Sequence, residues 1–155
     1  IGVSNFYRDR FEDLARSCEI MPAVNQMEMH VFQQQKSLCE FLKECGTQIE
    51  AWGPFAEGRR NYFQNPVLTQ IGAKYQKTAA QVALRFLFQQ GAVVIPKTVN
   101  LQQMQEDFNI FDFSLSQEDC ETISQLDEGQ TLYASQLHNE SGTWLCANPD
   151  TLETF

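Results

Sequence analysis

Polar side chains follow four short apolar runs of the sequence, at the point where each run ends. These endings are Ser4-Asn5, Asn25-Gln26, Trp52-Gly53-Pro54 and Lys97-Thr98. Hydroxyl and amide groups donate and accept hydrogen bonds, as an amide or hydroxyl partner requires. An indole offers a flat apolar surface for stacking, and a lysine offers a point charge for a phosphate. The residue types therefore favour ligand binding at the ends of successive segments.

Lys97 is the only Lys or Arg between Ala92 and the C-terminus, a stretch that holds eleven Asp and Glu residues. It closely precedes Asn100, which predicts the N-cap of a helix. Helix N-termini carry free backbone N–H groups and a dipole that favours anions. We therefore predict that Lys97 meets a phosphate beside this helix.

Each of these residues also has a purely structural interpretation. Ser4-Asn5 suits a turn, and the amides at the second ending can satisfy buried backbone groups. Trp52 suits a core, and Lys97 suits a solvated loop. The functional interpretation gains weight because all four endings fall at equivalent points of successive units.

Strand-like and helix-like segments alternate along the chain. The strand-like runs are Ile1–Val3, Ala23–Met27, Ile49–Trp52 and Ala92–Ile95. Helices are predicted between them by apolar spacing and by N-cap signals at Asn65-Pro66, Thr78-x-x-Gln81, Asn100 and Ser116. This alternation predicts an α/β fold with parallel strands, either an open doubly wound sheet or part of a (β/α)8 barrel. No G-x-G-x-x-G follows the first strand.

Composition narrows the class of partner. The chain has 155 residues, 43% of them apolar, and a net charge of −9. Nucleic acid and anionic membrane surfaces are poor partners for such a charge, and no apolar run has the length of a membrane span. Five cysteines without a C-x-x-C pair indicate free thiols in a reducing cytoplasm, and no ligand cluster predicts a metal site.

The order of the motifs resembles the aldo-keto reductase family. The matching segments are Ile1-Gly2-Val3-Ser4-Asn5-Phe6, Pro22-Ala23-Val24-Asn25-Gln26, Ala51-Trp52-Gly53-Pro54, the stretch from Lys77 to Arg85, Ile95-Pro96-Lys97-Thr98-Val99 and Phe111-Asp112-Phe113-Ser114-Leu115-Ser116. The resemblance covers residues 1–126, and residues 127–155 with His138, Asn139, Trp144 and Leu145 form a tail that matches more weakly. Members of the family are (β/α)8 barrels, so the chain is expected to form the C-terminal half of such a barrel.

The resemblance also implies a cofactor and the residues that hold it. Members reduce aldehydes and ketones with a nicotinamide cofactor, usually NADPH. The implied contacts are Ser4, Asn5 and Gln26 with the nicotinamide carboxamide, Trp52 with its ring, Gly53 and Phe55 with the pyrophosphate, Lys97 and Thr98 with the 2′-phosphate, and Glu106 and Asp107 with the adenine.

Two positions depart from the family pattern. Many NADPH-using members carry Arg where Gln103 stands, and a neutral amide cannot make a bidentate charged contact. Asp107 stands where Asn is common, which adds a negative charge near the expected phosphate. NADP(H) is still the cofactor that the resemblance implies, and these departures leave NAD(H) as the alternative.

The family's catalytic Asp, Tyr, Lys and His belong by the resemblance to the other half of the barrel. We therefore predict no catalytic residue in this chain and negligible reductase activity from it alone. As part of an enzyme it would hold the cofactor for a small carbonyl substrate. The alternative is a half-barrel without turnover that binds NADP(H) or associates with itself through its open sheet edges.

Overall fold

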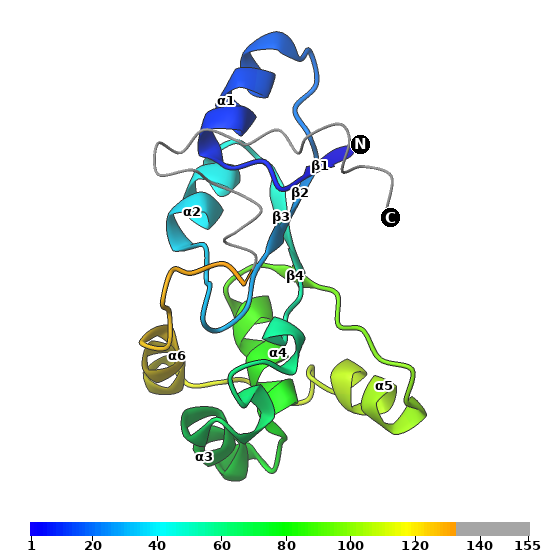
Figure 1. Cartoon of the computed structure of the whole chain (residues 1–155), viewed down its shortest axis with the longest axis vertical. Helices are drawn as coiled ribbons and strands as arrows, with labels where there is room; N and C mark the ends of the chain where they lie inside the picture. Colours follow the sequence, from blue (N-terminus) through cyan, green and yellow to red (C-terminus); the bar gives the residue numbers. More distant parts are fainter. Residues whose placement is uncertain (133–155) are drawn as a thin grey trace.

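A parallel β-sheet forms the centre of the computed structural model, which describes residues 1–132 (Figure 1). Its strands pair in chain order and are β1 (Gly2–Ser4), β2 (Val24–Glu28), β3 (Gln48–Trp52) and β4 (Val93–Val94). All four lie within about a residue of the predicted runs. The predicted parallel α/β arrangement is therefore confirmed for the described residues. His138, Asn139, Trp144 and Leu145 of the predicted tail lie outside them.

Helices connect the strands, and α1 and α2 lie along the same side of the sheet in Figure 1. The helices are α1 (Arg8–Ser17), α2 (Lys36–Glu44), α3 (Pro66–Tyr75), α4 (Ala79–Gln89), α5 (Leu101–Phe108) and α6 (Gln117–Ser124), with short 3₁₀ turns η1 (Ala56–Gly58) and η2 (Tyr62–Gln64). The predicted N-caps at Asn65, Thr78, Asn100 and Ser116 are confirmed, because each side chain accepts hydrogen bonds from the following turn.

The two faces of the sheet differ in burial. Met27, Ile49 and Ala51 are buried against the helices. Because side chains alternate along a strand, Gln26, Glu50 and Trp52 face the other way, and all three are only partly buried. These three strand-end residues therefore belong to the face that the helices do not cover.

Asn25 has the structural role that its sequence position allowed. The side chain is fully buried, and its Nδ2 donates to the carbonyl oxygen of Phe6 at 2.7 Å. Its Oδ1 accepts from the Phe6 N–H at 3.4 Å. Asn25 thus ties the loop after β1 to β2, while its neighbour Gln26 faces the open side.

Close packing of α3 against the start of α4 depends on Gly72. A Cβ atom at this position would lie 2.3 Å from the carbonyl oxygen of Lys77, a distance that no side chain tolerates. The Lys77 N–H in turn donates to the Gly72 carbonyl at 2.9 Å. The glycine therefore permits the sharp turn between the two helices.

Asp119 joins α6 to α3. Its carboxylate is 3% exposed by residue and accepts hydrogen bonds from Lys74 Nζ at 2.5 Å, Tyr75 Oη at 2.6 Å and Ser116 Oγ at 2.8 Å. Burial disfavours the ionised carboxylate, but these hydrogen bonds outweigh it and lower the pKa of Asp119. The ionised form therefore stabilises the contact between the helices.

Within residues 1–132, none of the helices has both the length and the apolar character of a membrane span. The same residues bring together no group of three His, Cys, Asp or Glu side chains that would hold a metal ion. Cys18, Cys39, Cys45 and Cys120 are free thiols.

Asp119→Asn should destabilise the fold by about 1.5–3 kcal/mol at neutral pH, the typical contribution of a hydrogen bond to a charged group. A lowered pKa in the folded state means that this stabilisation is complete above the ordinary Asp pKa of about 3.9. It is lost as the pH falls through the folded-state value. Urea unfolding of the full natural polypeptide that contains this sequence, measured at several pH values, should therefore show a deficit that shrinks in acid.

The matched control is Asp112→Asn, which alters a half-exposed carboxylate that pairs with Lys77 at 2.7 Å. Water screens the half-exposed Asp112 carboxylate, so this pair should contribute about 0–1 kcal/mol and the variant should stay close to the wild type. An Asp119→Asn deficit that is the same at every pH would contradict the assignment.

Candidate functional site

Ser4, Asn5 and Gln26 meet at the carboxyl ends of β1 and β2. Asn5 has a left-handed backbone with φ of 58°, and its N–H donates to the carbonyl oxygen of Gln26 at 2.8 Å. Ser4 Oγ donates to the same carbonyl at 3.2 Å. Asn tolerates this backbone conformation better than most residues with side chains do. The turn therefore holds both predicted side chains beside Gln26.

Trp52 extends this group from the neighbouring strand. Its indole Nε1–H donates to Asn5 Oδ1 at 2.9 Å, which links the end of β3 to the end of β1. Gln26 Nε2 donates to Glu50 Oε1 at 2.5 Å. We call these five residues, Ser4, Asn5, Gln26, Glu50 and Trp52, the strand-end group.

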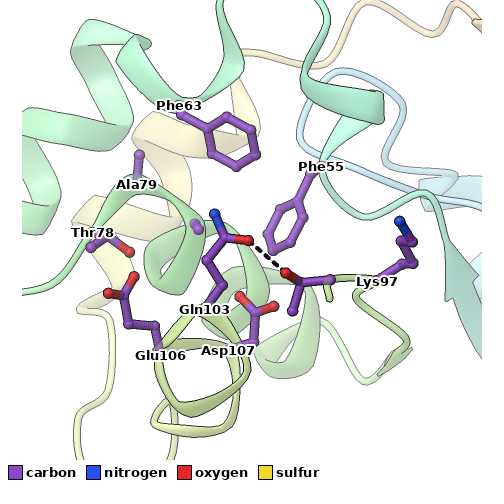
Figure 2. Close-up of a pocket in the computed structure, with 10 residues that line it drawn as sticks. Phe55, Phe63, Thr78, Ala79, Lys97, Gln103, Glu106 and Asp107 are labelled. Atoms are coloured by element: carbon purple, nitrogen blue, oxygen red, sulfur yellow. Dashed lines mark hydrogen bonds between the residues drawn. The ribbon is translucent and has the colours of Figure 1, made fainter. Parts of the chain in front are cut away.

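Phe55, Lys97, Thr98, Gln103, Glu106 and Asp107 surround a second feature, a cavity of about 270 Å³ (Figure 2). Phe63, Thr78, Ala79 and Ala80 complete its lining. The structure thus brings together the side chains that were predicted to lie near the 2′-phosphate and the adenine, and with them Phe55, which was predicted to lie near the pyrophosphate. They come from the segment after β4, helix α5 and the loop after β3, and we call the feature the α4–α5 cavity.

Gly53 lies on the segment that joins the strand-end group to the α4–α5 cavity. This residue follows Trp52 directly and precedes Phe55 by two positions. Its φ of 63° is unfavourable for other residues, although no atom lies within 4 Å of the place where a Cβ would be. The predicted residues therefore form two groups that Gly53 connects.

Charge is distributed unevenly around the cavity. Figure 2 shows the Lys97 side chain on one side of the view and the Glu106 carboxylate on the other. Burial, reinforced by the negative charge of Glu106, raises the pKa of Asp107. The cavity therefore offers the Lys97 ammonium to an anionic group of a ligand. The carboxyl groups of Glu106 and Asp107 can accept hydrogen bonds from a donor group of the ligand.

Gln103 has a defined orientation in this cavity. Thr98 Oγ1 donates to Gln103 Oε1 at 2.5 Å, as the dashed line in Figure 2 shows. Its amide nitrogen points away from Thr98 toward the cavity (Figure 2). Gln103 therefore presents a neutral N–H donor at the position for which the family resemblance implies Arg in many members.

The N-terminus of α4 was missed as part of the site. The sequence showed its capping box, and Thr78 Oγ1 indeed accepts from the Gln81 N–H at 3.2 Å. Ala79 and Ala80, which follow the cap, line the cavity and add the favourable dipole of a helix start. Alanine side chains carry no polar or reactive group, so nothing in the sequence indicated that Ala79 and Ala80 line a binding site. Phe63 on η2 was missed for the same reason.

A buried carboxylate also went unnoticed in the sequence. Glu28, at the end of β2, is 1% exposed and accepts from the Leu132 N–H at 2.9 Å and from Thr131 Oγ1. His30 Nε2 lies 3.1 Å from Glu28 Oε1, while its Nδ1 accepts from the Phe32 N–H at 3.2 Å. Because Nδ1 accepts, Nε2 carries the proton and donates to Glu28, so His30 has a structural hydrogen-bonding role.

Burial opposes ionisation of Glu28, but the hydrogen bonds from His30, Thr131 and Leu132 outweigh burial and lower its pKa. The segment that carries Thr131 is also held by Asp127, whose Oδ1 accepts from the Gln34 N–H at 3.1 Å. Residues 127–132 are therefore fixed at the end of β2, and we call them the C-terminal strap.

Tyr62 cannot easily serve as a proton donor to a ligand. The side chain is fully buried, its hydroxyl donates to the carbonyl oxygen of Pro54 at 2.7 Å, and burial raises its pKa. Tyr62 is therefore a packing residue.

Comparison with known proteins adds independent information. The profile of the Aldo/keto reductase family matches residues 1–128. Glyoxal reductase of Bacillus subtilis is 45% identical over 130 residues, which are 84% of this chain and 46% of that protein. The 9,11-endoperoxide prostaglandin H2 reductase of Trypanosoma cruzi is 41% identical over 133 residues, 85% of this chain and 47% of that protein. The chain spans about half the length of these relatives.

Solved structures agree with the sequence matches. An aldo-keto reductase from a Medee basin deep-sea metagenome library superposes with a TM-score of 0.83 at 34% identity, covering 86% of this chain and 49% of that one. The Bombyx mori aldo-keto reductase AKR2E4, solved in complex with NADP, gives a TM-score of 0.79 at 30% identity, covering 84% and 45%.

Glu28→Gln should loosen the C-terminal strap without unfolding the sheet, because the hydrogen bonds from Thr131 and Leu132 lose their charged acceptor. Hydrogen exchange at the Leu132 amide should accelerate by about tenfold, the equivalent of roughly 1.4 kcal/mol. In the wild type, the protection should be complete above the ordinary Glu pKa of about 4.3 and fall in more acidic solution.

Glu44→Gln, an exposed change at the end of α2, is the control and should leave this amide protected. Equal exchange at Leu132 in the wild type and in Glu28→Gln would rule out the carboxylate as the anchor of the strap.

Proposed function

Because the chain belongs to the aldo/keto reductase family, we propose that it holds NADP(H) for the reduction of aldehydes and ketones to alcohols. Its four strands and their helices form about half of the family's (β/α)8 barrel, not an open doubly wound sheet. The proposal concerns the whole protein in which these residues act.

The strand-end group is the observation that carries this proposal. Its amides, hydroxyl and indole lie together where the resemblance implies the nicotinamide. Asn5 and Gln26 would bind the carboxamide through donor and acceptor groups, and Trp52 would stack on the ring. The donor set therefore fits the nicotinamide end of the cofactor.

The α4–α5 cavity would receive the other end. Lys97 would meet the 2′-phosphate, and the start of α4 would add backbone N–H groups and a favourable dipole. Glu106 and Asp107 would accept from the amino group of the adenine. Relatives solved with NADP or NADPH support this choice of cofactor.

NADP(H) is favoured over NAD(H) by one charge. Lys97 is exposed at the cavity, and its ammonium can pair with the charge of a phosphate, whereas a ribose hydroxyl offers only a neutral hydrogen-bond acceptor. Gln103 supplies a neutral donor in place of a guanidinium, so the preference should be smaller than one that Arg and Lys produce together.

Hydride transfer is the chemistry that a bound nicotinamide supplies. This chain's residues would bind and orient the ring at the carboxyl ends of the strands. The general acid for the carbonyl oxygen would come from outside this chain, because the resemblance assigns the catalytic residues to the other half of the barrel and the Tyr62 hydroxyl is bound to the Pro54 carbonyl. A general acid typically contributes about 10²–10⁴-fold to the rate.

A second proposal is a non-catalytic protein that binds the cofactor or associates with itself. The exposed apolar side chains after β4 favour it; they are Val99, Leu101, Phe108 and Phe111. A concentration-dependent rise in sedimentation coefficient, combined with cofactor binding and no turnover, would support this second function over the first.

Lys97→Glu should weaken NADPH binding by about 10- to 100-fold, because a charge-assisted contact of about 1.5–3 kcal/mol is lost. NADH binding should change by less than about threefold, since NADH lacks the 2′-phosphate. Dissociation constants from titration calorimetry of the full natural polypeptide would measure both effects.

Lys43→Glu is the matched control, since it reverses an exposed lysine on α2 away from the cavity. It should affect neither cofactor. Losses of equal size for NADPH and NADH in Lys97→Glu would remove Lys97 from the phosphate.

Residues 1–155 expressed alone should show no carbonyl-dependent oxidation of NADPH above a protein-free blank, because no general acid is proposed among them. Absorbance of NADPH with a reactive aldehyde would measure it. Clear turnover that increases with protein concentration would refute the assignment of the acid to another part of the protein.

A further inference from the structure

Glu50 is the member of the strand-end group that the family resemblance did not assign. It lies two residues before Trp52 on β3, in register with Gln26 on β2. Its side chain is partly buried on the uncovered face of the sheet. The single hydrogen bond to its carboxylate from residues 1–132 comes from Gln26 Nε2, at 2.5 Å.

This contact decides which end of the Gln26 amide faces outward. A carboxylate only accepts hydrogen bonds, so Gln26 must turn its nitrogen toward Glu50. Gln26 lies at the edge of the strand-end group, and its Oε1 accepts no hydrogen bond from the described residues. Gln26 therefore presents an acceptor.

Asn5 is oriented in the opposite sense. An indole N–H only donates, so the bond from Trp52 Nε1 fixes Asn5 Oδ1 as the acceptor and turns Nδ2 away. Within residues 1–132, Nδ2 has no acceptor. One amide thus presents a donor and the other presents an acceptor, as a primary carboxamide requires.

We propose that Glu50 is a positioning residue that selects a nicotinamide carboxamide by holding the Gln26 oxygen toward the ligand. This inference rests on the proposed binding of NADP(H). The carboxamide NH2 would donate to Gln26 Oε1, and its carbonyl would accept from Asn5 Nδ2. Glu50 itself touches neither group.

A purely supporting role would have a different consequence. If Glu50 only stabilised the pairing of β2 with β3, its loss would weaken all dinucleotides alike. Selection through Gln26 instead predicts an effect that depends on whether the ligand carries an amide N–H. The reduced 3-acetylpyridine analogue of NADPH separates the two, because a methyl group replaces the NH2 and leaves only the carbonyl acceptor.

Glu50→Gln is the informative variant, since it changes one oxygen to a nitrogen and keeps the shape. The new amide can donate to Gln26 Oε1, which allows Gln26 to turn its nitrogen toward the ligand. The wild type should bind NADPH more tightly than the acetylpyridine analogue. In Glu50→Gln this ratio of dissociation constants should fall by about tenfold, as expected for one hydrogen bond gained or lost.

Titration calorimetry with both nucleotides, on the full natural polypeptide, would measure the ratios. Glu44→Gln, at the exposed end of α2, should leave the ratio unchanged. Glu50→Met, similar in size but without an acceptor, is a second variant in case Glu50→Gln does not fold. In Glu50→Met, the ratio should also fall, because Gln26 becomes free to rotate.

The outcomes separate the inference from the function on which it rests. Failure of the wild type to bind either nucleotide would overturn the proposed function. Binding of both, with a ratio that Glu50→Gln and Glu50→Met leave unchanged, would overturn the role of Glu50 and retain the cofactor. A reduced ratio with an unchanged urea midpoint would support selection rather than support of the sheet.

Discussion

Parallel strand pairing is the constraint on which the candidate site depends. The register pairs Ser4 with Gln26, Gln26 with Glu50, and Glu28 with Trp52. Residues that are 22 to 47 positions apart in sequence therefore form direct hydrogen bonds at one edge of the sheet. An antiparallel partner strand would place alternate ends at opposite edges and separate these side chains.

Helix starts and cavity charge follow from the same arrangement. The segments after β1, β2 and β4 run directly into the N-termini of α1, α2 and α5, which carry backbone donors and the positive ends of helix dipoles. Lys97 adds a full positive charge, whereas Glu106 and Asp107 add negative ones. In a chain with a net charge of −9, this separation of charge offers a local site for an anion.

Local signals in the sequence predicted the elements well. Asn65, Thr78, Asn100 and Ser116 were identified as caps because capping depends on residues within one turn. The strand-end residues were found because polar groups after apolar runs are conspicuous.

Contacts between distant segments were harder to predict. Alternation along β3 could have placed Glu50 on the face of Trp52, but only the register of β2 shows that it meets Gln26. Phe63 and Ala80 line the cavity through packing of η2 and α4, for which residue type gives no indication. The contacts of Glu28 with Thr131 and Leu132 could not be predicted either, because no residue near Thr131 in the sequence indicates a contact with β2.

The bond between Glu28 and Thr131 closes a loop across 103 positions of the chain. Closing a loop of this size costs more conformational entropy than forming a local contact, so the contact should form late in folding. During synthesis the carboxylate leaves the ribosome long before its partner does, at roughly 5–20 residues per second. The hydrogen bonds that Thr131 and Leu132 donate to Glu28 can therefore form only when nearly all of the described chain has been translated.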